Sequence, residues 1–165
     1  MPYTIAIFPE FKGLNKISSI IEKYNPDTNE LEPHIALVYY FEEKPRDGII
    51  NGIISKFSSF EIRLNKISES SRGNYIFLDV TCGRREIVKL KNTLYKKLGL
   101  KWKGDFSYNP HITLGKFGTK AEQKKVMKEI GDMNLDFSCK INSFLLLEMN
   151  DDLLTIKSEK KLEFS

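Results

Sequence analysis

The sequence predicts an α+β fold of two related lobes, in which two antiparallel sheets with outer helices flank a central cleft. Three observations lead to this fold class. The chain has 165 residues, 41% hydrophobic and 29% charged, which is the composition of a globular domain long enough to bury a core. Stretches with the alternation of strands are interleaved with stretches of helical periodicity. Finally, a Pro-His-Ile-x-Leu motif occurs twice, so we expect one domain over residues 1–165 with one motif strand per lobe, at 33–40 and 110–117.

The first part of the chain predicts two strands, each followed by a helix. Residues 3–8 and 34–41 are rich in β-branched and aromatic side chains, which is typical of strands. Apolar residues then recur at helical spacing over 14–24 and again over 49–57.

The middle of the chain repeats this interleaved order. Apolar and polar residues alternate over 60–64 and over 75–81, which predicts an antiparallel pair joined by a Ser-Ser-Arg-Gly-Asn turn. Helical spacing follows over 87–98, closed by Gly99. The second Pro-His strand is expected over 111–117.

The C-terminal part predicts a helix and three strands. Thr119 with Glu122 three residues later is a capping box for a helix that continues to about residue 130. A strand is expected over 137–141. A hairpin about Asn150-Asp151-Asp152 is expected to join the strands 144–149 and 153–158.

His34 and His111 are the only histidines of the chain, and each follows a proline in the repeated motif. Strand alternation places His34 with Ala36, and His111 with Thr113, on one face of each strand. Two lobes related by a pseudo-twofold axis would bring the equivalent strands side by side. The histidines would then face one another across a central groove.

Such a pair of imidazoles suits displacement at phosphorus. An imidazole titrates near pH 6.5, so one histidine can act as a neutral base while the other acts as a protonated acid. A hydroxyl two residues after each histidine can donate to the phosphate oxygens on which charge builds up. This chemistry requires no metal ion.

The duplicated His-x-Thr-like strands, the 77 residues between His34 and His111, and the segment 75–117 resemble the 2H phosphoesterase superfamily. The similarity is greatest to its LigT-like 2′–5′ RNA ligases and cyclic phosphodiesterases. The resemblance implies a bilobal α+β fold with a water-filled cleft, and hydrolysis or reversible ligation of RNA-type phosphodiesters, either 2′,3′-cyclic phosphates or 2′–5′ linkages, without metal or cofactor. By position, His34 and His111 match the catalytic histidines and Thr113 matches a phosphate-binding hydroxyl.

Ala36 departs from the family pattern, which has Thr or Ser at this position. Val38, two residues further along the same face by parity, is also apolar. Losing one such donor typically costs about 10²–10³ in rate, so we expect a weakened enzyme. The alternative is a nucleotide- or RNA-binding module that keeps the cleft and has lost efficient turnover.

Four further residues are candidates for contact with substrate. Tyr75 and Phe77 share a strand face and could stack on a base, although packing in the core is the competing interpretation. Tyr108 precedes the second motif and Lys116 follows its histidine. Strand parity places Lys116 on the face opposite to His111, which weakens its claim on phosphate.

The remaining sequence features set broader limits. A net charge of +4 suits a polyanionic partner such as RNA ends but is too small to establish one. No signal peptide and no apolar run of roughly 20 residues is apparent, so we expect a cytoplasmic protein without a membrane partner, of open oligomeric state and compatible with a monomer. Cys82 and Cys139 are expected to be reduced core residues. Two histidines without a cluster of carboxylates or thiolates nearby in the sequence are a poor metal-ligand set.

Overall fold

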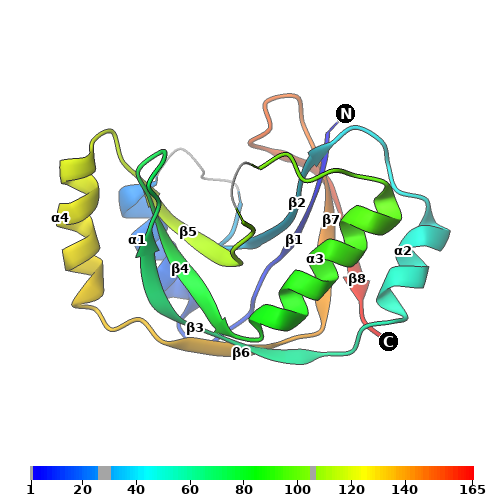
Figure 1. Ribbon diagram of the computed structural model, residues 1–165, viewed down its shortest axis with the longest axis horizontal. Helices are drawn as coiled ribbons and strands as arrows, with labels where there is room; N and C mark the ends of the chain where they lie inside the picture. Colours follow the sequence, from blue (N-terminus) through cyan, green and yellow to red (C-terminus); the bar gives the residue numbers. More distant parts are fainter. Residues whose placement is uncertain (1, 26–30, 105–106) are drawn as a thin grey trace.

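The computed structural model describes residues 2–25, 31–104 and 107–165. Within these ranges the chain forms four helices and one curled, antiparallel sheet of eight strands, in the order β6-β3-β4-β5-β2-β1-β7-β8 (Figure 1). The strands are β1 (Tyr3–Ile7), β2 (Ile35–Phe41), β3 (Phe60–Glu69), β4 (Tyr75–Cys82), β5 (His111–Lys116), β6 (Phe137–Ile141), β7 (Ser143–Met149) and β8 (Ile156–Glu163). The helices are α1 (Leu14–Tyr24), α2 (Asp47–Ile54), α3 (Arg84–Leu98) and α4 (Lys120–Gly131).

The sheet consists of two halves that meet where the two motif strands pair. One half contains β1, β2, β7 and β8, and the other contains β3, β4, β5 and β6. The α+β class with antiparallel strands is confirmed. The two expected sheets are joined into one, because β2 and β5 pair through a single position, Ile35 opposite Ile112.

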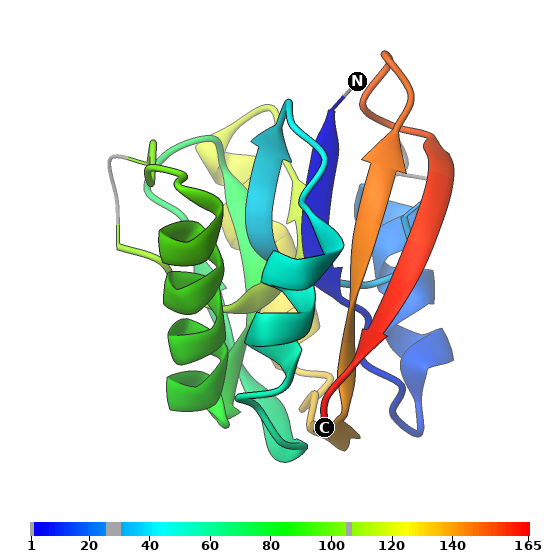
Figure 2. The same cartoon turned by 90° about the vertical axis from the view of Figure 1, so that its right-hand side faces the viewer.

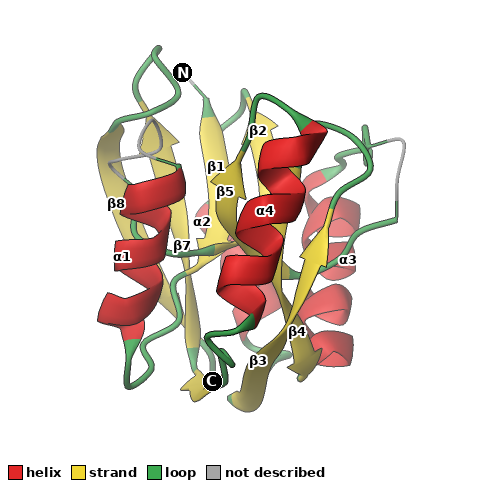
Figure 3. Cartoon of the chain, turned by 90° about the vertical axis from the view of Figure 1, so that its left-hand side faces the viewer, coloured by secondary structure: helices red, strands yellow, loops and turns green. Residues whose placement is uncertain are grey.

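The helices cover the two ends of the curled sheet. Helices α2 and α3 lie on one side (Figure 2), and α1 and α4 lie on the other (Figure 3). Two of them cross between the halves: α1 follows β1 but packs against β5, and α3 follows β4 but packs against β2. Each motif strand is therefore backed by a helix that the other half of the sheet contributes.

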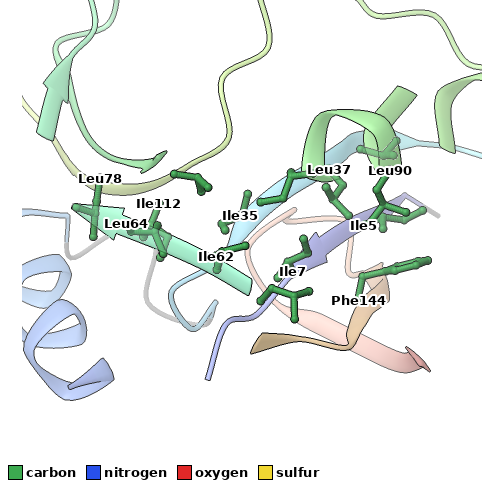
Figure 4. Packing of buried hydrophobic residues seen from close by; sticks show 14 of the residues in the cluster. Ile5, Ile7, Ile35, Leu37, Ile62, Leu64, Leu78, Leu90, Ile112 and Phe144 are labelled. Carbon is green, nitrogen blue, oxygen red and sulfur yellow. The ribbon is translucent and has the colours of Figure 1, made fainter. Parts of the chain in front are cut away.

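One cluster of buried side chains runs through both halves (Figure 4). Ile35 and Ile112, at the junction, are fully buried, as are Ile5 on β1 and Leu78 on β4. The apolar residue that follows each histidine thus anchors the motif strand in the core.

Several local predictions are confirmed. Thr119 caps α4, its hydroxyl accepting a hydrogen bond from the Glu122 amide at 3.2 Å. Gly99 ends α3 in the left-handed conformation, with φ of 66°. Gly83, just before α3, also has a positive φ (79°), and a Cβ there would collide with the Glu61 carbonyl oxygen. That close approach depends on the pairing of distant strands and has no local pattern in the sequence.

Other boundaries and environments differ from expectation. Helix α2 begins at Asp47 and ends at Ile54, earlier than the expected 49–57. Strand β3 continues to Glu69, because it pairs with β4 as far as Glu69 opposite Ile76. The prediction that Cys82 lies in the core is wrong: it ends β4 beyond the covered part of the sheet and is exposed, whereas Cys139 is half-buried. No helix in the described ranges is long and apolar enough to cross a membrane.

Candidate active site

The pairing of β2 with β5 places the two motifs in a compact square. Ile35 opposite Ile112 is the position at which these strands pair, and continuing that antiparallel register by one residue in either direction would set His34 opposite Thr113 and Ala36 opposite His111. The two histidines are then diagonal neighbours, which in an antiparallel pair lie roughly 7–8 Å apart.

The His34 ring is oriented by the backbone that precedes it. Its Nδ1 lies 2.9 Å from the Glu32 carbonyl oxygen, and its ring stacks on Phe8 with centroids 5.5 Å apart. Because a carbonyl oxygen only accepts, Nδ1 carries the hydrogen and donates it, which leaves Nε2 as the basic nitrogen. Burial lowers the pKa of His34 below 6.5, and the bond to Glu32 opposes that shift.

His111 is held in the same way. Its Nδ1 lies 2.6 Å from the Asn109 carbonyl oxygen, so it also donates from Nδ1, and the Phe77 ring lies over it at 3.9 Å. Burial lowers the pKa of His111, opposed by the Asn109 carbonyl and by the charge of Asp79, while the charge of His34 lowers it further. Each histidine thus donates to the carbonyl two residues before it and leaves Nε2 for chemistry.

A polar network behind His111 has no counterpart at His34 among the hydrogen bonds of the described residues. The Asn109 side chain donates to the buried Asp79 carboxylate at 2.9 Å and accepts a hydrogen bond from Arg84. Asp79 lies directly opposite His111 across the β4–β5 ladder. Sequence analysis missed Asp79 and Asn109; the Asn before the second Pro-His was the only local signal. The network makes the two histidines electrostatically unequal.

A cavity of about 570 Å³ opens over this face of the sheet. Among the residues that line it are His34, Ala36, Thr113, Tyr75 and Lys116. Neither His111 nor Phe77 lines it, and the Phe77 ring packs against the His111 imidazole with centroids 3.9 Å apart. The motif face is thus hollowed, with His34 and Thr113 open to the cavity.

The predicted orientation of Lys116 is wrong, because β5 contains a bulge. Thr113 pairs with Phe77, but Gly115 pairs with Ile76 and Lys116 with Tyr75, so that one extra residue is inserted on β5. A bulge breaks the alternation of faces. Lys116 therefore shares the face of Tyr75, and its ammonium lies 5.5 Å from the centre of that ring. The sequence-based objection to a phosphate contact by Lys116 does not hold.

Strand β2 contains two similar irregularities against β1. Ala6 pairs with Ala36, but Ile5 pairs with Val38 and Tyr3 with Phe41. Val38 is therefore buried opposite Ile5, only 1% exposed, and the expectation that it shares the face of Ala36 is wrong.

The other candidate contacts separate into different roles. Tyr75 lines the cavity and stacks on Phe77, with centroids 5.9 Å apart. Tyr108 does not line the cavity: its hydroxyl donates to the Ala36 carbonyl oxygen at 2.8 Å, and burial raises its pKa. Tyr108 thus ties the segment before β5 to β2, across the junction between the halves. In the described part of the chain, no three His, Cys, Asp or Glu side chains come together as a metal-binding group.

Comparison with protein families decides the relationship. The model of the 2′-5′ RNA ligase superfamily matches residues 8–153. The chain belongs to this superfamily. Among solved structures, Escherichia coli LigT in apo form superposes with a TM-score of 0.65 at 14% identity, covering 100% of this chain and 99% of LigT. LigT complexed with 3′-AMP gives 0.58 at 15% identity, over 98% of this chain and 97% of LigT.

A structure described as a phosphoesterase gives a TM-score of 0.55 at 14% identity, over 98% of both chains. At these identities the structural matches show the fold that members of this superfamily share. A search of curated proteins finds no match.

Proposed function

We propose that the protein is a metal-independent phosphodiesterase that acts on RNA-type phosphodiesters, with a 2′,3′-cyclic phosphate or a 2′–5′ linkage at the scissile position. The observation that carries the proposal is the matched orientation of His34 and His111. Both donate from Nδ1 to a backbone carbonyl, so both keep Nε2 as the basic nitrogen. Two imidazoles on diagonal positions of one face supply the acid and the base that an in-line displacement needs.

In this mechanism His34 is the base and His111 the acid. Nε2 of His34 takes a proton from water as the water oxygen bonds to phosphorus. The bond from phosphorus to the leaving ribose oxygen breaks, and that oxygen receives the proton of His111 Nε2. The charge of Asp79, which favours the protonated form of His111, supports this assignment. Ligation follows the same path with a ribose hydroxyl in place of water as the attacking group, and in the reverse reaction the two histidines exchange roles.

The lowered pKa values of the two histidines affect their protonation before substrate binds. Burial lowers the pKa of both histidines, which favours their neutral forms before substrate binds. A phosphodiester anion next to His111 raises its pKa and recruits the proton that the leaving oxygen needs. Thr113 donates to a non-bridging oxygen, and the Lys116 ammonium adds positive charge on the same face.

The test is hydrolysis of a nucleoside 2′,3′-cyclic phosphate in the presence of EDTA. Turnover should survive the chelator, and His34→Ala and His111→Ala should each lower it by at least about 10². Lys124→Ala, on an exposed position of α4, is the control and should be unchanged. Turnover that EDTA abolishes, or that neither histidine substitution affects, would contradict the proposal.

A binding module is the second candidate, and Ala36 is the observation that favours it. Such a module would bind cyclic phosphates or oligonucleotides without turnover, even after Ala36→Thr restores the hydroxyl. In either case we expect RNA ends or small nucleotides as ligands, in the cytoplasm.

A further inference from the structure

A second cavity adjoins the histidine site. It measures about 780 Å³ and lies between the loop 42–46 before α2 and the segment 99–104 after α3. Tyr39 and Tyr40 line both cavities, so the two share a wall. The second cavity contains neither histidine and is not explained by the acid–base chemistry.

The shared wall is built by the irregular pairing of β2. Between Val38, opposite Ile5, and Phe41, opposite Tyr3, the strand carries one residue more than β1. The bulge turns both tyrosines out of the core, and their exposed fractions are 43% for Tyr39 and 46% for Tyr40. Exposed aromatic side chains of this size, gathered beside a cleft, indicate a binding surface.

Aromatic rings extend from this wall into the second cavity. The Trp102 ring lies 5.6 Å from that of Tyr39. Trp102 also packs edge-on against Tyr95 and Tyr108. The ammonium of Lys91, a residue that is only 7% exposed, lies 4.2 Å from the centre of the Trp102 ring. Trp102 is thus supported from behind, and it lines the second cavity together with Tyr39.

The rim of the second cavity is basic. Four cations, Lys44, Arg46, Lys101 and Lys103, line it against two acids, Glu42 and Glu43. Lys101 and Lys103 flank Trp102, and all four cations are exposed. A basic groove with aromatic stacking platforms is the arrangement that binds single-stranded nucleic acid without sequence preference.

We propose that the second cavity binds a neighbouring nucleotide of a single-stranded RNA whose end lies at the histidines. Tyr39 is five residues beyond His34, at most about 16 Å along the strand at 3.3 Å per residue. A base stacked there belongs to a different nucleotide from the one attacked. This inference rests on the proposed function and narrows the substrate to the end of an oligoribonucleotide, in preference to a free mononucleotide.

The kinetic test compares a short oligoribonucleotide ending in a 2′,3′-cyclic phosphate with the corresponding cyclic mononucleotide. One stacked base is worth about 1–3 kcal/mol, so kcat/KM should be at least about fivefold higher for the oligonucleotide. The double variant Lys101→Ala/Lys103→Ala should reduce that preference and leave mononucleotide turnover unchanged, because neither lysine lines the histidine cavity. Lys96→Ala/Lys97→Ala removes the same charge from exposed positions at the end of α3 and should retain the preference.

A binding test separates this inference from the proposed function. Trp102 is the only tryptophan of the chain, so its fluorescence reports occupancy of the second cavity without turnover. In the His111→Ala variant, the oligonucleotide should change this fluorescence at concentrations at which the mononucleotide does not. Such a change in fluorescence, together with no turnover by the wild type, would support nucleotide binding in the second cavity and refute the proposed phosphodiesterase activity. Equal kcat/KM for both substrates, with no fluorescence response to the oligonucleotide, would overturn the inference. That result would leave the proposed phosphodiesterase activity standing.

Discussion

Ala36→Thr is expected to increase turnover of a 2′,3′-cyclic phosphate. Ala36 follows Ile35 on β2 as Thr113 follows Ile112 on β5, and Ile35 pairs with Ile112, so the substitution gives both motifs a hydroxyl at the equivalent position. The position has room for the larger side chain, since it lines the cavity and its neighbour on β1 is the small Ala6. Threonine also suits a strand.

The magnitude follows from the value of one hydrogen bond to a charged transition state. A donor aimed at a developing oxyanion is worth about 10²–10³ in kcat when its geometry is ideal. A newly introduced hydroxyl lacks neighbouring groups that hold it in the ideal position. A charge-assisted hydrogen bond at the lower limit of about 1.5 kcal/mol corresponds to roughly tenfold. We therefore expect kcat to increase by at least about tenfold. With ideal geometry the increase would reach about 10²–10³.

The assay measures kcat and KM under EDTA for the wild type, Ala36→Thr and Ala36→Val. Valine has the shape of threonine without the donor, so it reports any effect of filling the cavity. In the same assay Thr113→Val should lower kcat by about 10²–10³, because it removes the one hydroxyl that the motifs retain. Equal kcat for the threonine and valine variants of Ala36 would refute the reasoning that the hydroxyl is the missing element.

Three other predictions concern the framework of the site. Because burial lowers the folded-state pKa of both histidines below 6.5, the unfolded chain binds more protons as pH falls through 6.5 toward the folded-state values. The free energy of unfolding should therefore decrease as pH falls through that window and should show no such contribution above it. Chemical denaturation of the wild type, beside a variant with both histidines changed to Gln, measures the difference. Equal slopes of the free energy of unfolding against pH in the two proteins would contradict the prediction. Tyr108→Phe removes the hydrogen bond to the Ala36 carbonyl and should cost about 1 kcal/mol in urea denaturation, together with a loss in kcat; unchanged kcat would limit Tyr108 to a role in stability. Gly99→Ala should cost about 1 kcal/mol for its positive φ alone. Gly83→Ala should destabilise the protein more, because of these two positions only Gly83 has backbone in the way of the added Cβ. Equal shifts in Tm would show that the backbone of β3 moves to accommodate the Cβ.

The meeting of the two motif strands could be predicted from the sequence because the motif is duplicated. Two histidines in matched strands define a pair of positions, and the buried Ile35 and Ile112 between them set the register in which the strands meet. Local chemistry was equally informative at Thr119, where a side chain caps its own helix. These features depend on residues close together in the sequence or on an internal repeat.

The errors at Lys116 and Val38 came from counting faces along strands. Parity assigns each residue to a face only while the ladder is regular, and one inserted residue reverses every assignment beyond it. The bulge on β5 moved Lys116 to the cavity face, and those on β2 buried Val38 and exposed both tyrosines. A bulge is set by the pairing with a distant strand, so it leaves no local signal. Asp79 was missed for the same reason, since it meets His111 only through the β4–β5 pairing.

These irregularities make the surroundings of the two motif copies different. The second copy has Thr113, Lys116 on the cavity face through its bulge, and Asp79 opposite its histidine. The first copy has Ala36 in place of a hydroxyl, and its two bulges present Tyr39 and Tyr40. If the second copy carries the phosphate and the first guides the strand, Ala36→Thr should act on kcat and substitutions around Tyr39 on the preference for long substrates. Effects of both changes on the same kinetic constant would show that the two motifs share a single task.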